Sequence, residues 1–201
     1  MALEIERRFL VAGDGWRVHA GEPQALAQGY LASAAEGLTL RVRQASPLPA
    51  DGGGALAPTA AVAGSTAAQA WLTLKLPAGG IARHEFEYAI PVADAEQLLG
   101  HCATALHKWR HPLDLPGGDW VLDVFEGANA PLVIAEVELE RPDSPLTVPS
   151  WCVRELTGDG RFSNAALARQ PFASWPDADR ARLEQLLEAD ARSARAPAPD
   201  A

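Results

Sequence analysis

The stretch LEIERRF, residues 3–9, alternates apolar and charged side chains. Successive side chains of a β-strand point to opposite faces, so a period of two predicts a strand with one apolar and one charged face. The apolar face carries Ile5 and Phe9. The charged face carries Glu4, Glu6 and Arg8. Because charges are costly to bury unpaired, this face must meet either water or a charged ligand.

The same alternation recurs along most of the chain. It predicts further strands in residues 38–43, 72–76, 83–90, 106–110, 120–125 and 132–139. The bases on their polar faces are Arg41, Arg43, Lys75, Arg83, Lys108 and Arg110. The acids on those faces are Glu85, Glu87, Asp123, Glu136 and Glu138. Every strand predicted in this way therefore has a charged face.

Like charges occur in pairs on these faces, for example at Glu136 and Glu138 and at Arg41 and Arg43. Alternate residues of a strand lie about 7 Å apart, so each pair repels itself unless opposite charge lies across from it. A sheet with one solvated face is the common explanation of alternating strands. A solvated face usually mixes several polar residue types, whereas these faces separate acids from bases. We therefore favour an enclosed, water-filled cavity that holds a charged ligand.

The predicted fold is α+β, with a closed antiparallel β-barrel that has a charged interior. The apolar strand faces need a cover, and helical periodicity predicts helices at residues 93–103, 164–168 and 177–190. A barrel with these helices packed outside satisfies both kinds of face. Stability alone does not explain so many enclosed charges, because desolvation usually cancels the Coulomb gain.

The chain has 201 residues, of which 48% are hydrophobic, and this is enough for one compact domain. We assign the barrel to residues 1–175, a C-terminal helix to 176–190 and a disordered tail to 191–201. Residues 45–70 are rich in proline and glycine and lack apolar periodicity. They are predicted to be a disordered insertion between two strands.

The formal net charge of −9 argues against a broad electrostatic grip on nucleic acid or anionic lipid. The two cysteines lack metal-ligand spacing and favour a reducing compartment. The sequence contains no run of about 18 apolar residues, which a membrane span requires. We therefore expect a cytoplasmic protein with neither a nucleic-acid nor a membrane partner. The oligomeric state stays open, with a homodimer as one alternative.

The chemistry of the charged faces indicates which class of ligand they bind. Arginine forks and lysine ammonium groups hold phosphate oxygens, and clustered carboxylates bind Mg²⁺ or Mn²⁺. Both lysines of the chain, Lys75 and Lys108, fall on these faces. The combination predicts a small-molecule polyphosphate bound together with a divalent metal.

Residues 4–11, EIERRFLV, resemble the E-x-E-x-K motif that opens members of the CYTH superfamily, the triphosphate tunnel metalloenzymes. Further matching segments follow in the family's order. They are QGYL at 28–31, LRVR at 40–43, LTLK at 72–75, RHEFE at 83–87, KWR at 108–110, LDVF at 122–125, EVE at 136–138, ELT at 155–157 and RFSN at 161–164. The resemblance covers residues 3 to 170, apart from the insertion.

The resemblance implies an eight-stranded barrel whose interior binds a triphosphate. It assigns the triphosphate to Arg41, Arg43, Lys75, Arg83, Lys108 and Arg110, with Arg161 a further candidate. It assigns the catalytic metal, Mg²⁺ or Mn²⁺, to Glu4, Glu6, Glu136 and Glu138. It leaves Glu85, Glu87 and Asp123 to a second metal or to orienting the bases.

One departure from the family pattern concerns water activation. In hydrolases that this chain resembles, a lysine at the third motif position works with the tyrosine of the QGYL segment; here these positions are Arg8 and Tyr30. Arginine stays protonated at neutral pH and is no base. We expect Arg8 either to lower the pKa of Tyr30 or to add a phosphate contact. Residues 159–162, DGRF, also lack the lysine and tyrosine often found there in relatives.

The sequence predicts a metal-dependent triphosphatase that most resembles the branch hydrolysing inorganic tripolyphosphate. Thiamine triphosphate and nucleoside triphosphates are alternative substrates, and a class IV adenylyl cyclase would use the same cavity and metal. A non-catalytic polyphosphate-binding module is an alternative from another class, motivated by Arg8. A structural protein with a solvated sheet is the remaining alternative.

Overall fold

The computed structural model describes residues 2–33, 37–47 and 68–193. Its strands are β1 (Ala2–Val11), β2 (Gln24–Ser33), β3 (Thr39–Pro47), β4 (Gln69–Gly79), β5 (Ala82–Ile90), β6 (Ala105–Leu113), β7 (Asp119–Phe125), β8 (Val133–Glu138) and β9 (Cys152–Glu155). Its α-helices are α1 (Val92–His101), α2 (Asn164–Arg169) and α3 (Asp177–Ser193). Short 3₁₀ turns are η1 (Gly15–His19), η2 (Gly127–Asn129), η3 (Gly160–Phe162) and η4 (Phe172–Ser174).

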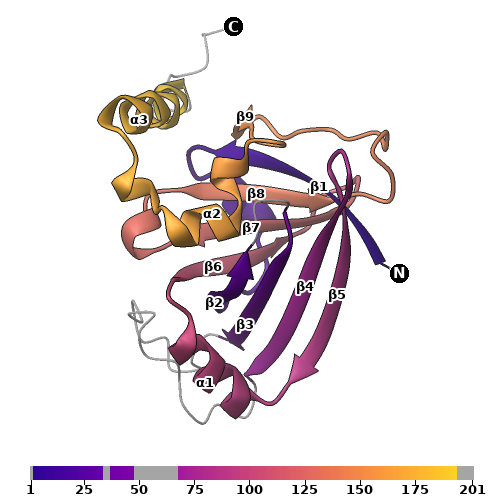
Figure 1. Cartoon of the computed structure of the whole chain (residues 1–201). Helices are drawn as coiled ribbons and strands as arrows, with labels where there is room; N and C mark the ends of the chain where they lie inside the picture. Colours follow the sequence, from indigo (N-terminus) through magenta and orange to yellow (C-terminus); the bar gives the residue numbers. More distant parts are fainter. Residues whose placement is uncertain (1, 34–36, 48–67, 194–201) are drawn as a thin grey trace, which may run out of the picture.

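The strands form one antiparallel sheet in the order β5-β4-β3-β2-β6-β7-β8-β1-β9, and β5 also pairs with β1. That pairing closes eight strands into a barrel (Figure 1). Residues 2–5 of β1 pair with β5, and residues 9–11 of the same strand pair with β9. Strand β9 therefore lies outside the closed ring, and the predicted eight-stranded antiparallel barrel is confirmed.

Two strands, β2 and β9, lack the alternating charges from which the other strands were predicted. Strand β2 carries the small or uncharged run QALAQGYLAS, and β9 is only four residues long. Across from Lys108 and Arg43, β2 places Leu26 and Gln28. Its interior face therefore has no charge that would mark it as a barrel strand.

Helix α1 covers the outside of β2, β3 and β4. Its buried Ala95 packs in one cluster with Val42 and Ala70. The close approach requires Gly29 on β2, because a Cβ there would lie 2.5 Å from the sulfur of Cys102. A glycine inside a strand often marks such a contact. The cover predicted for the apolar strand faces is thus in place on this side.

A second cluster covers the outside of β1, β7 and β8. Phe9 stacks on Trp120 with ring centroids 5.9 Å apart, and Trp16 of η1 and Trp151 belong to the same buried group. These aromatic side chains cover the outer face of β1, whose inner face carries Glu4 and Glu6. Burial of such rings is among the largest single contributions to a core.

The C-terminal elements close one end of the barrel. Interior side chains at that end are apolar and pack with side chains that follow β9. The barrel contributes Leu10, Leu106, Phe125 and Ile134, and the later elements contribute Leu167, Phe172, Trp175 and Leu183. The C-terminal helix therefore shares a core with the barrel, and α3 contacts β9.

The structure corrects the bounds of two predicted segments. Residues 45–47 belong to β3 and residues 69–70 to β4, and both Ala45 and Ala70 are buried. The remainder of the predicted disordered insertion, 48–67, lies outside the described residues, as does 194–201. Helix α3 runs to Ser193, beyond the predicted start of the tail at 191. The strands continue past the alternating residues because small side chains at their ends, Ala45 and Ala70, are buried.

Among the helices of the described ranges, none is long and apolar enough to cross a membrane.

Candidate functional site

The charged faces predicted from the sequence meet inside the barrel. They enclose a cavity of about 580 Å³. Its lining includes Glu4, Glu6, Arg8, Arg41, Arg43, Lys75, Glu85, Glu87, Arg110, Glu136 and Glu138. The cavity is thus lined mainly by the side chains that alternate along the strands.

One wall of the cavity is acidic. Glu6 on β1 lies directly opposite Glu138 on β8, and like charges opposite each other destabilise a strand pair. Burial, together with the nearby carboxylate of Glu136, raises the pKa of Glu6 to about 7. Burial and the neighbouring acids Glu4, Glu85 and Asp119 also raise the pKa of Glu138. The described bases therefore leave part of this wall's negative charge uncompensated.

The opposite wall presents arginines and lysine from β3 and β4. One guanidinium nitrogen of Arg43, Nη2, lies 3.0 Å from each carboxylate oxygen of Glu87. Arg41 donates to the hydroxyl of Thr73 at 3.1 Å. The Nζ of Lys75 lies 2.6 and 2.7 Å from the two oxygens of Glu4. Arg43 and Lys75 are thus held by acids that lie two strands away in the ring, Glu87 on β5 and Glu4 on β1.

Two hydrogen-bond donors of this basic wall have no acceptor among the described residues. The Nε atoms of Arg41 and Arg43 are buried without a hydrogen-bond partner. Burial and the charge of Arg41 lower the pKa of Arg43 to about 10, so its guanidinium stays protonated at neutral pH. A bound anion would supply the acceptors and the negative charge that this wall lacks.

Arg8 lies where three cavities meet. It lines the large cavity and two smaller ones, of about 270 and 150 Å³. Its Nε pairs with Glu6 and lies 3.2 Å from Oε1 of Glu136. Burial opposes its charge, but Glu6 and Glu136 outweigh burial and raise its pKa further above the ordinary value. Arg8 is therefore a permanent cation at the centre of the site.

Tyr30 lines the 270 Å³ cavity together with Arg8, Arg41 and Arg83. Burial raises the pKa of its hydroxyl to about 12, and the opposing effect of Arg41 and Arg8 is smaller. The expected lowering of this pKa by Arg8 is therefore outweighed by desolvation. At neutral pH the hydroxyl of Tyr30 is a hydrogen-bond donor and not a base.

Two predicted site residues lie beneath the cavity wall. The side chains of Lys108 and Asp123 are both fully buried and pair with each other. Arg110 binds the same carboxylate, with Nε 2.7 Å from Oδ1 and Nη2 2.6 Å from Oδ2. Nη2 of Arg110 also lies 2.6 Å from Oε2 of Glu136. Asp123 thus orients Arg110, and neither Lys108 nor Asp123 lines the cavities described above.

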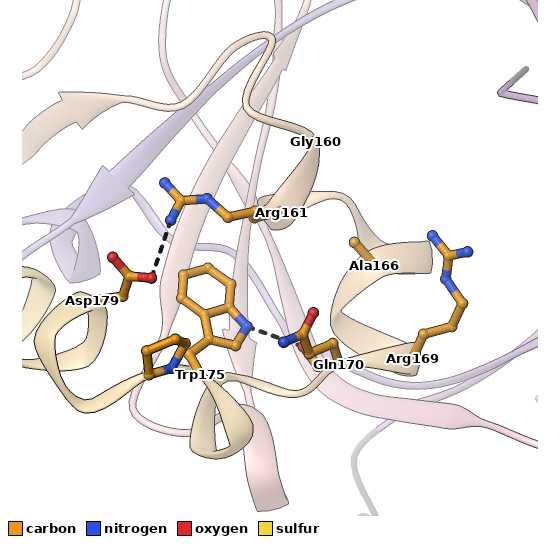
Figure 2. A pocket seen from close by; sticks show the side chains of 8 residues that line it. Gly160, Arg161, Ala166, Arg169, Gln170, Trp175 and Asp179 are labelled. Atoms are coloured by element: carbon orange, nitrogen blue, oxygen red, sulfur yellow. Dashed lines mark hydrogen bonds and ion pairs between the residues drawn. The ribbon is translucent and has the colours of Figure 1, made fainter. Parts of the chain in front are cut away.

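Arg161 lies outside the barrel interior, on a surface pocket of about 790 Å³ beside α2 and the start of α3 (Figure 2). Its guanidinium is bound by Asp159, 2.8 Å away, and lies 3.8 Å from Asp179. It also stacks over Trp175, 5.3 Å from the ring centroid. The structure therefore separates Arg161 from the bases that the sequence groups it with. The reason is that β9 and the turn that follows it run outside the closed ring.

Other residues of the site were not predicted. Asp119 and Asn164 line the large cavity, and Thr73 bridges Arg41 and Glu87. Asp119 and Thr73 fall at positions that the alternation places on the inner face. Asn164 is the first residue of α2 and belongs to no alternating strand, so tertiary contacts bring it to the cavity.

The acidic wall fits a divalent metal by its chemistry. Carboxylates of Glu4 and Glu6 on β1 and of Glu136 and Glu138 on β8 line the same cavity. Oxygen ligands of this kind are preferred by Mg²⁺ and Mn²⁺, and a cation would relieve the repulsion between the opposed glutamates. Across the part of the chain that is described, no group of three potential ligands is already gathered around one point. The glutamates would therefore have to exchange basic partners for the metal.

Over most of its length the chain is similar to a known protein family and to two named proteins. A family model described as CYTH domain matches residues 2–165. An inorganic triphosphatase of Acetivibrio thermocellus is 31% identical over 179 residues, which are 88% of this chain and 100% of that protein. An inorganic triphosphatase of Nitrosomonas europaea is 34% identical over 171 residues, 82% of this chain and 96% of that protein.

The fold has a counterpart among solved structures. A crystal structure of an inorganic triphosphatase aligns with a TM-score of 0.54 at 31% identity. The alignment covers 88% of this chain and 98% of that one. The closed barrel, its charged interior and the family match over all nine described strands agree with one another. The chain is a member of the CYTH domain family.

Proposed function

We propose that this protein hydrolyses a triphosphate in a metal-dependent reaction, with inorganic tripolyphosphate as the first candidate substrate. The observation that carries the proposal is the single cavity in which an acidic wall faces a basic wall. A triphosphate needs both, because its oxygens bind guanidinium groups on one side and a divalent cation on the other. The names of the similar proteins support inorganic tripolyphosphate in particular.

The phosphate oxygens would be held by the bases that line the cavities. These are Arg41, Arg43, Lys75, Arg83 and Arg110, with Arg8 between them and the acidic wall. Glu85, Glu87 and Asp123 orient these bases: Glu87 binds Arg43, Asp123 binds Arg110, and Glu85 lies 3.4 Å from Lys75. We assign Lys108 an indirect role and Arg161 none in phosphate binding.

The metal, Mg²⁺ or Mn²⁺, would be held by Glu4, Glu6, Glu136 and Glu138. When bound, it would neutralise phosphate oxygens and supply a positioned water. The residues of the chain would align the terminal phosphoryl group and stabilise the charge that moves onto the leaving oxygen. Phosphoryl transfer depends mainly on positioning and electrostatics, so a strong base is not required. Protonated Arg8 and Tyr30 would serve as donors in such a reaction.

Phosphate release from tripolyphosphate, ATP and thiamine triphosphate, each with Mg²⁺ and with Mn²⁺, tests the proposal. We expect metal-dependent turnover of tripolyphosphate above the other substrates, and its loss in Glu6→Gln. Cyclic AMP formed from ATP would instead identify a cyclase. Tight tripolyphosphate binding without turnover of any substrate would overturn the hydrolase proposal and leave a binding module.

A further inference from the structure

Lys108 is a base of the charged faces, yet it has no access to the cavity. Its side chain is fully buried inside the barrel, next to Phe125 of the apolar cluster that closes one end. Its ammonium group is shared between the carboxylate of Asp123 and Oδ1 of Asn164, which lies 3.1 Å from Nζ. It also lies 5.4 Å from the ring centroid of Phe125. The buried charge is therefore connected to the cavity by two groups, Asn164 directly and Arg110 by way of Asp123.

The contact with Lys108 fixes the orientation of the Asn164 side chain. An ammonium group has only donors, so the carboxamide must turn its oxygen toward Lys108. Its NH₂ group then points away from the buried pair. Asn164 lines both the 580 Å³ cavity and the 270 Å³ cavity, at the position where they adjoin. Within the described residues, the NH₂ group has no protein acceptor, and it is not buried.

The surroundings of this NH₂ group are those of the phosphate-binding bases. Both cavities that Asn164 lines also contain Arg8, Arg41 and Lys75. A neutral donor among cations adds a directed hydrogen bond without adding charge repulsion. Burial and the neighbouring Arg110 lower the pKa of Lys108 to about 8, so its ammonium group remains mostly protonated at neutral pH and donates to Asn164.

From this geometry, and resting on the proposed function, we propose that the Asn164 carboxamide donates to a phosphate oxygen of the bound triphosphate and that Lys108 is a positioning residue acting through it. Asn164 would contact the substrate where the two cavities meet, beside Arg8. The buried Lys108–Asp123 pair would hold the amide in the orientation that presents its donor. Lys108 itself would make no phosphate contact.

Two substitutions at Asn164 separate a substrate role from a structural one. Asn164→Ala removes both the donor and the acceptor, without adding charge. Asn164→Asp keeps an acceptor for Lys108 and replaces the donor with an oxygen. A role limited to satisfying Lys108 would be preserved in the aspartate variant, whereas a role as a phosphate donor would be lost in both.

The measurement is the dissociation constant of tripolyphosphate by titration calorimetry, in EDTA so that no turnover consumes the ligand. We expect Asn164→Ala to weaken binding about 10- to 100-fold, the range of one hydrogen bond to a charged group, and Asn164→Asp to weaken it at least as much. Gln97→Ala, which removes an exposed carboxamide from α1, is the matched control and should bind like the wild type. Melting temperatures of all variants show whether the fold is kept.

The positioning role of Lys108 is tested by Lys108→Met alone and combined with Asn164→Ala. If Lys108 acts through Asn164, the two losses of affinity will not add, and the double variant will bind about as well as Asn164→Ala. Additive losses would overturn the positioning role. Unchanged affinity in Asn164→Ala would overturn the donor role while leaving the proposed function intact. Failure of the wild type to bind tripolyphosphate would overturn both.

Discussion

At the scale of single residues, the site is a balance of charges that the ligand must complete. Glu6 illustrates it, because its carboxylate faces Glu138 across the strand pair and is near Glu136. Arg8 compensates it only in part, and the pKa of Glu6 remains near 7. An acid with a raised pKa is a cost to the folded, metal-free protein at neutral pH.

A first prediction concerns the stability of the metal-free protein. The pKa of Glu6 is about 7 in the folded chain, against an ordinary value of 4.5. Between these two pH values the folded state therefore binds more protons than the unfolded state. Stability from this group is therefore present below pH 4.5 and is lost as the pH rises to 7. Glu6→Gln should melt at a higher temperature than the wild type at pH 8, and the difference should shrink at pH 5. His107 and His111, whose pKa values are lowered by burial, act in the opposite direction in both proteins and cancel in the difference. An equal difference at both pH values would contradict the assigned shift.

A second prediction concerns Tyr30. Its hydroxyl stays protonated because burial raises its pKa to about 12, so it serves as a donor only. Tyr30→Phe should lower kcat/KM about 10-fold or less, below the 10²- to 10⁴-fold typical of a lost general base. The pH profile of kcat/KM between 6 and 9 should keep its shape. A loss of 10³-fold with a displaced profile would return Tyr30 to the role of a base.

A third prediction separates Arg161 from the cavity bases. Arg161 is half exposed and neutralised by Asp159 and Asp179 on the outer surface. Arg161→Ala should change the KM for tripolyphosphate less than twofold, and exposed ion pairs contribute little to stability. Arg43→Ala is the matched comparison inside the cavity and should raise KM at least 10-fold. Equal effects of the two substitutions would place Arg161 in the binding path.

At the scale of elements, packing outside the barrel fixes the walls of the cavity. Helix α1 lies against β2 and β3, the strands that carry Tyr30, Arg41 and Arg43. Its fit depends on the missing side chain of Gly29, where a Cβ would lie 2.5 Å from Cys102 and 3.1 Å from Leu99. A small change on the outer face should therefore reach the inner one through the shared strand.

A fourth prediction follows from this contact. Gly29→Ala should destabilise the protein by about 1–3 kcal/mol through overpacking, which corresponds to a melting temperature lower by roughly 2–12 °C. Gly100→Ala in α1 is the control, because a Cβ there meets nothing within 4 Å and alanine favours a helix. Scanning calorimetry of both variants measures the two melting temperatures, and only that of Gly29→Ala should fall. A Gly29→Ala protein as stable as the wild type would show that α1 can move away at no cost.

At the scale of the whole molecule, closure of the barrel places acids of β1 and β8 opposite bases of β3 and β4. Interior side chains at one end are apolar and join the C-terminal helices, so the charged cavity occupies the remaining part. Apolar clusters outside the barrel and at one end stabilise the fold, and the charges are kept for a ligand. The fold is expected to gain stability when that ligand is present.

A fifth prediction measures this gain. Tripolyphosphate in EDTA, where no turnover consumes it, should stabilise the folded chain by about 2.7 kcal/mol at about 100 times its dissociation constant. For a chain of this size the melting temperature should rise by roughly 5–11 °C. Mg²⁺ alone should raise the melting temperature of the wild type, and this rise should be near zero in Glu6→Gln. An equal rise with sodium sulfate at the same ionic strength would indicate general anion binding instead.

Alternation in the sequence predicts the barrel and most of the charges that line its interior. A period of two is read directly from neighbours in the chain, so the strands with charged faces and their acids and bases were predictable from Glu4 through Glu138. The uncharged β2 and the short β9 gave no such pattern, and packing of the buried Ala45 and Ala70 extends β3 and β4 beyond the predicted bounds.

Which of these charges face the cavity depends on tertiary contacts. Lys108 and Asp123 alternate like the other members of their strands, yet closure of the ring and the apolar cluster at one end bury them as a pair. Arg161 follows the family's order but lies after β9, outside the ring, whereas Asn164 is brought to the cavity at the start of α2. The physical reason is that alternation specifies a face of a strand, while the depth along the barrel and the partners across it depend on contacts far apart in the sequence.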